Sequence, residues 1–456
     1  MTQAVERLTA HVMATDFENL SPEAVIATKT FCLDTLGVSV AGTSAPHADE
    51  MRITAAGWGD GQEATALGMG NRLNAPTAAM INAFHAHSLE FDCVHELAVV
   101  HPLTTIQSAA LAYAERGGGV AGRDLLTALA LGVDVATSIG MASQSSLRFF
   151  RPATAGIFGA TAAVGKLARL SESQLMDALG LAYAQAAGTM QSHVEGGPAL
   201  ALQMAFAAAA AIRAVDLAQA GFPGPHDILE GPFGYFPLYE GTWELEPVWA
   251  ELGDLWRITQ VSHKPFPSGR ATHGGLDGIL QLRQAHALSP DAVEHVTLLA
   301  PSLIHELVGR PLQVVMSANY ARLCFQFVGA LALANGDVRI DDFTDGGLTD
   351  AHIHELARRI EVVIDDNPDP NALAPQTVVI RLRDGGEHRI DVPHTLGSPE
   401  RPLTRAQHLE KFRRCLQSGA AELPSDAADR LIALVDNLDT LDNTNELIIP
   451  LCPVTA

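Results

Sequence analysis

The chain has 456 residues, of which 47% are hydrophobic, and a formal net charge of −23. This length predicts two domains, and the acidic balance argues against nucleic acid or an anionic membrane surface as a partner, since both attract basic proteins. The cysteines form no CxxC pair, which argues against a disulfide framework or a zinc ribbon and favours a reducing cytoplasm: Cys32, Cys93, Cys324, Cys415 and Cys452.

The N-terminal residues predict no secretory signal peptide, because residues 1–17 lack a basic region followed by a long apolar one. The most apolar stretch, residues 196–212, is interrupted by Gln203 and followed by Arg213 and Asp216. We therefore expect it to form a buried helix and not a membrane span.

Helical periodicity runs through most of the chain up to about residue 260. Residues 104–117, 123–141 and 173–190 carry apolar side chains at i, i+3 and i+4 spacing. Ser21 and Ser171 stand where helix N-caps are expected. The many small residues in these segments predict closely packed helices in a large all-helical body.

Residues 117–122, GGGVAG, match the GxGxxG pattern of dinucleotide-binding proteins. That motif requires a preceding strand, whereas the residues before this one have a helical pattern. We therefore interpret these glycines as a turn between two helices and predict no nicotinamide or flavin cofactor.

The pattern changes after residues 264–270, where short β-branched runs begin to alternate with helical ones. A hairpin turn is predicted at residues 384–386, Asp-Gly-Gly. The predicted strands lie within residues 291–301, 361–366 and 376–393, and the predicted helices within residues 316–336 and 348–360.

The predicted fold class is mainly α, with a large all-helical domain and an inserted smaller α+β domain. Helical patterns return near the C-terminus, within residues 406–419 and 426–438. We therefore assign residues 1–265 together with 395–456 to the helical domain, and residues 266–394 to the α+β domain.

Residues 89–102, LEFDCVHELAVVHP, concentrate ionisable side chains. The spacing of Asp92, His95 and His101 matches no common zinc or iron motif, so we predict no metal. A carboxylate beside an imidazole orients the ring and poises it for acid–base chemistry near neutral pH. The alternative interpretation is a group of polar residues on an exposed loop.

Residues 262–273, SHKPFPSGRATH, place cationic side chains at the junction of the two predicted domains. Two prolines make this segment stiff and extended. Lys264 and Arg270 suit the binding of carboxylates, and lysine can also act as a base. A solvated linker is the alternative. Farther upstream, Arg148 and Arg151 precede a helix of small residues and suit anion binding, although surface arginines explain them equally well.

Taken in order, several segments resemble the MmgE/PrpD family, which includes 2-methylcitrate dehydratases, cis-aconitate decarboxylases and iminodisuccinate epimerases. The resemblance spans nearly the whole chain and is carried by residues 31–42 (FCLDTLGVSVAG), 82–92 (NAFHAHSLEFD), 101–102 (HP), 156–170, 221–236, 264–273 and 397–412. It implies a helical main domain, an inserted lid domain with the active site between them, homodimers and chemistry without a cofactor. It also implies site roles for His87, Glu90, Asp92, His101 and Lys264.

The sequence departs from the family pattern at several side chains that carry protons. The substituted positions are Phe150-Arg151, Leu200, Gln203, Phe327 and Gly269, together with Cys93 in place of a second aspartate. Loss of hydroxide or of a carboxyl group needs a positioned donor besides the base. Moving one proton away and back needs fewer groups.

We therefore predict a cofactor-independent epimerase, an isomerase that removes and returns the Cα proton of a succinate-type polycarboxylate, as iminodisuccinate epimerases do. His101 and Lys264 are the predicted acid–base pair, and Glu90 or Asp92 is predicted to orient His101. The predicted substrate-binding residues are Arg151, Arg270, Arg148, His87 and Ser268.

Two alternatives stay open: a hydro-lyase of the 2-methylcitrate dehydratase type, and a non-catalytic family member that binds a polycarboxylate. The expected partners are a small polycarboxylate and a second copy of the chain, with no nucleic acid and no membrane. We expect the protein to lie in the cytoplasm.

Overall fold

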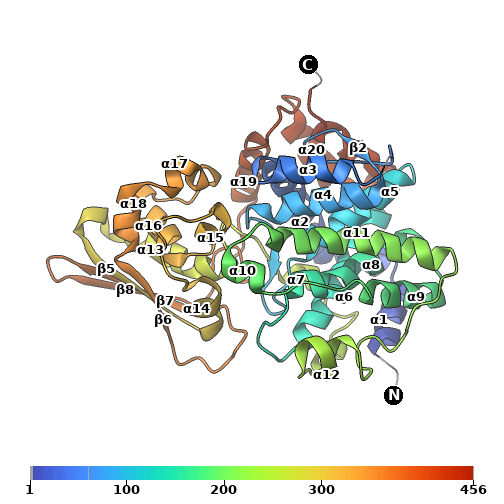
Figure 1. Cartoon of the computed structure of the whole chain (residues 1–456), viewed down its shortest axis with the longest axis horizontal. Coiled ribbons are helices and arrows are strands. Elements are labelled where there is room, and N and C mark those ends of the chain that lie inside the picture. Colours follow the sequence, from blue (N-terminus) through green and yellow to red (C-terminus); the bar gives the residue numbers. More distant parts are fainter. Residues whose placement is uncertain (1–3, 60, 455–456) are drawn as a thin grey trace.

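Helices make up most of the computed structural model, which describes residues 4–59 and 61–454 (Figure 1). This agrees with the mainly α class expected from the sequence. The helices outside the sheet-containing part are α1 (Ala4–Ala14), α2 (Pro22–Ala41), α3 (Ala48–Ala56), α4 (Ala75–Ser88), α5 (Pro102–Arg116), α6 (Gly122–Ala142), α7 (Arg151–Thr154), α8 (Gly156–Leu167), α9 (Glu172–Tyr183), α10 (Gln191–Glu195), α11 (Ala199–Gln219), α12 (Glu246–Trp249), α19 (Arg405–Gln417) and α20 (Ala427–Asp436).

Close helix packing follows from the small residues on these helices. α4, α5, α6, α8 and α11 pack against one another around one apolar core. At the contact of α6 with α8, a Cβ atom on Gly159 would lie 2.4 Å from the carbonyl oxygen of Gly132. Residues 117–122 form the turn between α5 and α6, where Gly118 and Gly119 have φ angles of 88° and 96°, as the sequence predicts.

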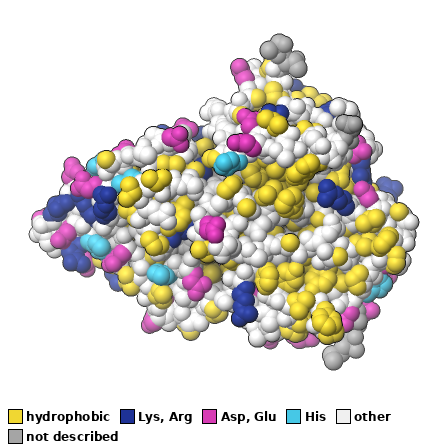
Figure 2. All heavy atoms as spheres, viewed as in Figure 1, with side chains coloured by type: hydrophobic (Ala, Val, Ile, Leu, Met, Phe, Trp, Pro, Cys, Tyr) yellow, Lys and Arg dark blue, Asp and Glu magenta, His cyan; other side chains and the backbone are white. Residues whose placement is uncertain are grey.

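Within residues 4–59 and 61–454, three helical segments are long and apolar enough to cross a membrane by length and composition: Pro22–Ser44, Gly122–Ala142 and Ala199–Gln219. In this fold the apolar window of α6 is 94% buried, so its side chains serve the core. α11 is buried along one side and exposes Phe206 and Leu217 on another. Hydrophobic side chains gather on the surface of the helical part around this helix (Figure 2).

A four-stranded sheet with the order β6-β5-β7-β8 forms the second part of the molecule (Figure 1). β5 runs parallel to β6 and antiparallel to β7, and β8 is antiparallel to β7. The part comprises α13 (His273–His286), β5 (Val293–Ala300), α14 (Ser302–Val308), α15 (Ala318–Arg322), α16 (Phe325–Asn335), α17 (Asp345–Leu348), α18 (Ala351–Ala357), β6 (Ile360–Ile364), β7 (Gln376–Leu382) and β8 (Glu387–Val392). Its buried apolar side chains form a second core, which runs from Phe266 to Ile380 and includes Val99.

The helix expected over residues 316–336 is interrupted between α15 and α16. Cys324 is extended, with φ −105° and ψ 103°, and forms an isolated β-bridge with Gly309. The backbone carbonyl of Arg322 accepts a hydrogen bond from the amide of Gly269 at 3.1 Å, so it is used outside the helix. A long-range contact therefore overrides the local helical pattern.

The C-terminal helices return to the helical part, where α19 packs against α2. The ring of Phe412 lies so close to Gly37 that a Cβ there would come within 2.7 Å of it. Lys411 of α19 lies 2.7 Å from Asp34 of α2, and both side chains are buried. Residues far apart in the sequence thus share one core.

We expect Gly159→Ala to destabilise the helical part by about 1–3 kcal/mol, because the added methyl group must push α8 away from α6. The midpoint of thermal unfolding measures this loss. Gly346→Ala is the matched control, since Gly346 also lies in a helix, is exposed and has no atom within 4 Å of its added Cβ. Equal midpoints for the two variants would contradict the close packing.

Candidate active site

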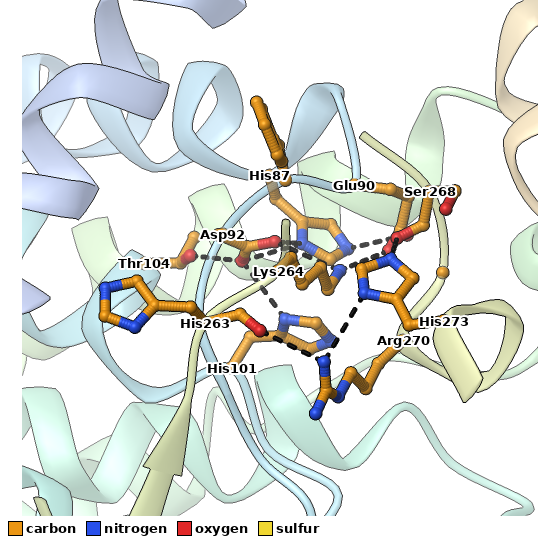
Figure 3. A network of polar contacts seen from close by, with 12 residues as sticks. His87, Glu90, Asp92, His101, Thr104, His263, Lys264, Ser268, Arg270 and His273 are labelled. Atoms are coloured by element: carbon orange, nitrogen blue, oxygen red, sulfur yellow. Dashed lines mark hydrogen bonds and ion pairs between the residues drawn. The ribbon is translucent and has the colours of Figure 1, made fainter. Parts of the chain in front are cut away.

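A short antiparallel ladder brings the two candidate segments together. In it β3 (Val94–His95) pairs with β4 (Val261–Ser262), with Val94 opposite Ser262 and His95 opposite Val261. Continued by two residues, this register brings Asp92 opposite Lys264, and Lys264 Nζ lies 3.5 Å from Asp92 Oδ1 (Figure 3). Backbone pairing therefore places the lysine of one segment on the carboxylate of the other.

Glu90 adopts a left-handed backbone conformation with φ 51°, which is uncommon for a residue other than glycine. It lies just after the end of α4, and its amide donates to the carbonyl of His87 at 3.0 Å. The tight turn brings Glu90 Oε1 within 3.3 Å of His87 Nε2. Lys264 Nζ donates to Glu90 Oε2 at 2.9 Å. The strained backbone of Glu90 thus places its carboxylate between His87 and Lys264.

His87 lies between the two carboxylates (Figure 3). Its Nδ1 donates to Asp92 Oδ2 at 3.0 Å, and its Nε2 faces Glu90. Burial acts against the charged imidazole, but the negative charges of Asp92 and Glu90 outweigh it and raise the pKa of His87 to about 10. His87 is therefore an imidazolium at neutral pH and serves the buried network.

Both carboxylates are ionised despite their burial. The charges of Lys264 and His87 hold the pKa of Glu90 well below its usual value, and the pKa of Asp92 is held down by His101, His87 and Lys264. Thr104 adds a hydrogen bond of 2.5 Å to Asp92 Oδ2. Two cations, His87 and Lys264, thereby balance two anions.

His101 stands at the start of α5 with its Nδ1 3.3 Å from Asp92 Oδ2. Burial and the positive charges of Lys264 and His87 outweigh the attraction of Asp92 and lower the pKa of His101. The ring is neutral at pH 7. Because a carboxylate only accepts, its proximity favours the tautomer with the proton on Nδ1 and a free lone pair on Nε2.

Beside this network lies a cavity of about 60 Å³, which has room for only a few water molecules. Both parts of the molecule contribute to its walls. Its polar lining is Glu90, His101, His193 and Arg270, and its apolar lining includes Val99, Leu147, Phe150, Met190, Val308 and Leu323. The cavity therefore exposes a ligand to few ionisable groups.

His193 of α10 was not predicted from the sequence. It is buried, and Arg310 Nη2 lies 3.2 Å from its Nδ1. Burial and the charge of Arg310 lower the pKa of His193 to about 4, so the ring is neutral. An arginine only donates, so Nδ1 accepts and Nε2 carries the proton. The two histidines of the cavity thus have opposite tautomers.

Two arginines predicted to bind substrate carboxylates have partners within the protein. The guanidinium of Arg151 forms a two-point ion pair with Glu240 at 3.2 and 3.1 Å and also bonds to backbone carbonyls. Arg270 lines the cavity, but its Nε and Nη2 donate to Glu96 at 3.1 and 2.8 Å, and its Nη1 donates to the carbonyls of His263 and Leu396. Both guanidinium groups are therefore engaged within the protein, and their roles in substrate binding stay predictions.

The remaining predicted residues lie in mixed positions. Arg148 is exposed on a loop, outside the network. Ser268 is buried with its hydroxyl 2.8 Å from that of Thr272. Lys264 is fully buried and reaches the cavity only through Glu90. His95 is apart from the network, next to Gln260 at 3.4 Å.

Among the residues that the structure describes, two groups of side chains are close enough to hold a metal ion. Ligand atoms of His87, Asp92 and His101 lie within 4.8 Å of one another, as do those of Asp34, His263 and His408. In each group a lysine already lies at the carboxylate, Lys264 at Asp92 and Lys411 at Asp34. The cationic positions are thus filled by ammonium groups of the protein.

Comparison with known proteins gives matches over nearly the whole chain. Residues 6–247 match the MmgE/PrpD N-terminal domain, and residues 266–440 match the MmgE/PrpD C-terminal domain. The human cis-aconitate decarboxylase is 26% identical over 447 residues, covering 94% of this chain and 90% of the relative. That of Aspergillus terreus is 26% identical over 415 residues, covering 86% and 84%. By these matches, the chain belongs to the MmgE/PrpD family.

Proposed function

We propose that this protein is an enzyme that moves a proton at a carbon atom next to a carboxylate of a polycarboxylate, without a cofactor. The observation that carries the proposal is His101. Its ring is neutral, its Nδ1 faces Asp92, and it lines the cavity beside a charge-balanced network. A neutral imidazole held by a carboxylate has the form that a general base needs.

His101 Nε2 takes the α-proton, and the electron pair moves toward the adjacent carboxylate. His193, with its proton on Nε2 and Arg310 behind it, offers a donor for the enolate-like oxygen. The apolar remainder of the lining strengthens these interactions because it lowers the local dielectric constant. The two histidine tautomers therefore have complementary tasks.

Epimerisation is our first candidate within this class. The proton returns to the opposite face from Lys264 through Glu90, which lines the cavity and accepts a 2.9 Å hydrogen bond from the ammonium. His101 then holds one proton and Lys264 has lost one, and exchange with water restores both. The scarcity of further donors favours this reaction: Phe150 lines the cavity, while Phe327 is buried in the second core.

A lyase reaction, by decarboxylation or dehydration, is the second candidate. It is supported by relatives that are cis-aconitate decarboxylases over nearly the full chain length. In a decarboxylation, His101 Nε2 would first take a proton from water and then give it to the carbanion that remains after carbon dioxide leaves. In a dehydration, Nε2 would remove the α-proton before hydroxide leaves. The products distinguish the two candidates.

The sheet-containing part is proposed to act as a lid, with residues 266–394 as the inserted domain. Its residues Val308 and Leu323 line the same cavity of about 60 Å³ as Glu90 and His101. Because the cavity is so small, we propose that the two parts of the molecule move apart when the substrate enters. A cytoplasmic homodimer is proposed as well, and the exposed Phe206 and Leu217 of α11 suit its interface.

Incubation in deuterated water with chiral 2-substituted succinates, and separately with cis-aconitate, tests these candidates. We expect deuterium at Cα with inverted configuration, followed by NMR. An absorbing alkene or released carbon dioxide would instead favour the lyase. Absence of exchange, alkene and carbon dioxide would contradict both and leave the non-catalytic binding role.

His101→Gln is expected to slow the observed reaction by about 100-fold or more, because it removes the base. Lys264→Gln should slow epimerisation by a similar factor, since it removes the returning proton. The control is His352→Gln, because His352 is exposed on the sheet-containing part. Full activity of both site variants would refute the assignment.

The rate should depend on pH through His101. The neutral form is the base, so activity is present above the pKa of His101 and falls as the pH drops through it. Because burial and two nearby cations lower this pKa, we expect the acid limb of kcat/KM to lie below pH 6.5. A limb above pH 6.5, or one that persists in His101→Gln, would contradict this reading.

A further inference from the structure

Arg322, on α15, is a buried cation with donor atoms that find no hydrogen-bond partner in the described part of the chain. The residue is 2% exposed, and its Nε and Nη1 atoms have no partner among the residues that the structure describes. One face of the guanidinium lies on the ring of Phe343, 4.4 Å from the ring centre. Burial lowers the pKa of Arg322 to about 10. An unpaired buried charge is costly, so this arrangement calls for an anion.

Arg310, which also lies in the sheet-containing part, has buried donor atoms without a partner among the described residues as well. Its Nε and Nη1 are buried without a partner in the described chain, while Nη2 reaches Leu307 O and His193 Nδ1, each at 3.2 Å. The guanidinium lies over the ring of Tyr320 at 4.8 Å. Arg310 therefore keeps two unused donor atoms while it positions His193.

Both arginines flank the proposed site. The negative charge of Glu90, which lines the cavity, acts on both guanidinium groups and opposes the lowering of their pKa by burial. Their chain neighbours Leu307, Val308 and Leu323 line the same cavity from the sheet-containing part. The guanidinium groups of Arg151 and Arg270, in contrast, donate hydrogen bonds to Glu240 and Glu96, respectively.

We propose that Arg322, together with Arg310, forms a carboxylate-binding subsite that anchors a substrate carboxylate remote from the reacting carbon. The inference rests on the proposed function and adds to it the residues that bind the second carboxylate. The planar fork of an arginine matches a carboxylate with two hydrogen bonds. One carboxylate then lies at His193 and the reacting carbon, and the other lies at Arg322.

Binding of succinate and of propionate to the intact protein, measured by calorimetry, tests this subsite. The wild type should bind succinate at least tenfold more tightly than propionate, because only succinate has the second carboxylate. Arg322→Gln should lose about tenfold or more of succinate affinity and leave propionate affinity nearly unchanged. Arg322→Lys, which keeps the charge without the fork, should fall between them.

Arg358→Gln is the matched control, since Arg358 is an exposed arginine of the same part. Thermal unfolding without ligand gives a second readout. A purely structural Arg322 would make Arg322→Gln less stable, whereas an unpaired charge that awaits a ligand makes the variant as stable as the wild type or more so. Wild-type succinate affinity in Arg322→Gln, or no succinate binding by the wild type, would overturn the subsite.

The two proposals fail in different ways. Succinate binding that depends on Arg322, combined with no exchange, alkene or carbon dioxide, would keep the subsite and refute the enzyme reaction. Exchange with full succinate affinity in Arg322→Gln would keep the reaction and refute the subsite.

Discussion

The candidate site depends on a buried balance of charge between two cations and two carboxylates. Lys264 and His87 are both buried and lie at Glu90 and Asp92. Each ion on its own would be costly in the protein interior, and removal of any one would leave another uncompensated. The balance also fixes the state of His101, because the nearby cations keep this ring neutral while Asp92 orients it. The protonation state of His101 is thus set by Asp92, His87 and Lys264, none of which is among the cavity-lining residues.

Support for this network comes from the other end of the chain. Lys411 of α19 donates to the carbonyl of Phe91 at 2.9 Å and lies over the Phe91 ring at 4.3 Å. Phe91 is the residue between Glu90 and Asp92 in sequence. Lys411 also pairs with Asp34 of α2. A second buried ion pair therefore holds the loop that carries the two carboxylates.

Local patterns predicted the helices well, while the acid–base roles stay predictions. α5 and α6 lie within two residues of their predicted ranges, and the structure brings Glu90, Asp92 and Lys264 together. That Asp92 and Lys264 belong to one site was predicted only from the resemblance to a family, because no spacing rule relates residues so far apart in the sequence.

Partners of a side chain that lie far away in the sequence could not be predicted. Arg151 meets Glu240 and Arg270 meets Glu96, and neither carboxylate is close in sequence. An arginine looks free until its partner is placed, so the local pattern favoured substrate binding. The reverse holds for Arg322, whose lack of a partner becomes visible only once the core has closed around it. His193 gave no signal, since its role comes from Arg310.

The ladder of β3 and β4 has a consequence for insertions and deletions in the flanking loops. It holds only two residue pairs, yet it sets which residue of one segment faces Asp92. A slip by one residue turns side chains to the opposite face and offers His263 in place of Lys264. The ammonium of Lys264 would then no longer lie against Glu90 and Asp92, so the two buried carboxylates would lose one of their two cationic partners. The register of these two residue pairs therefore determines which charged side chain faces Asp92. An insertion or deletion in either flanking loop is tolerated only if it leaves this register unchanged.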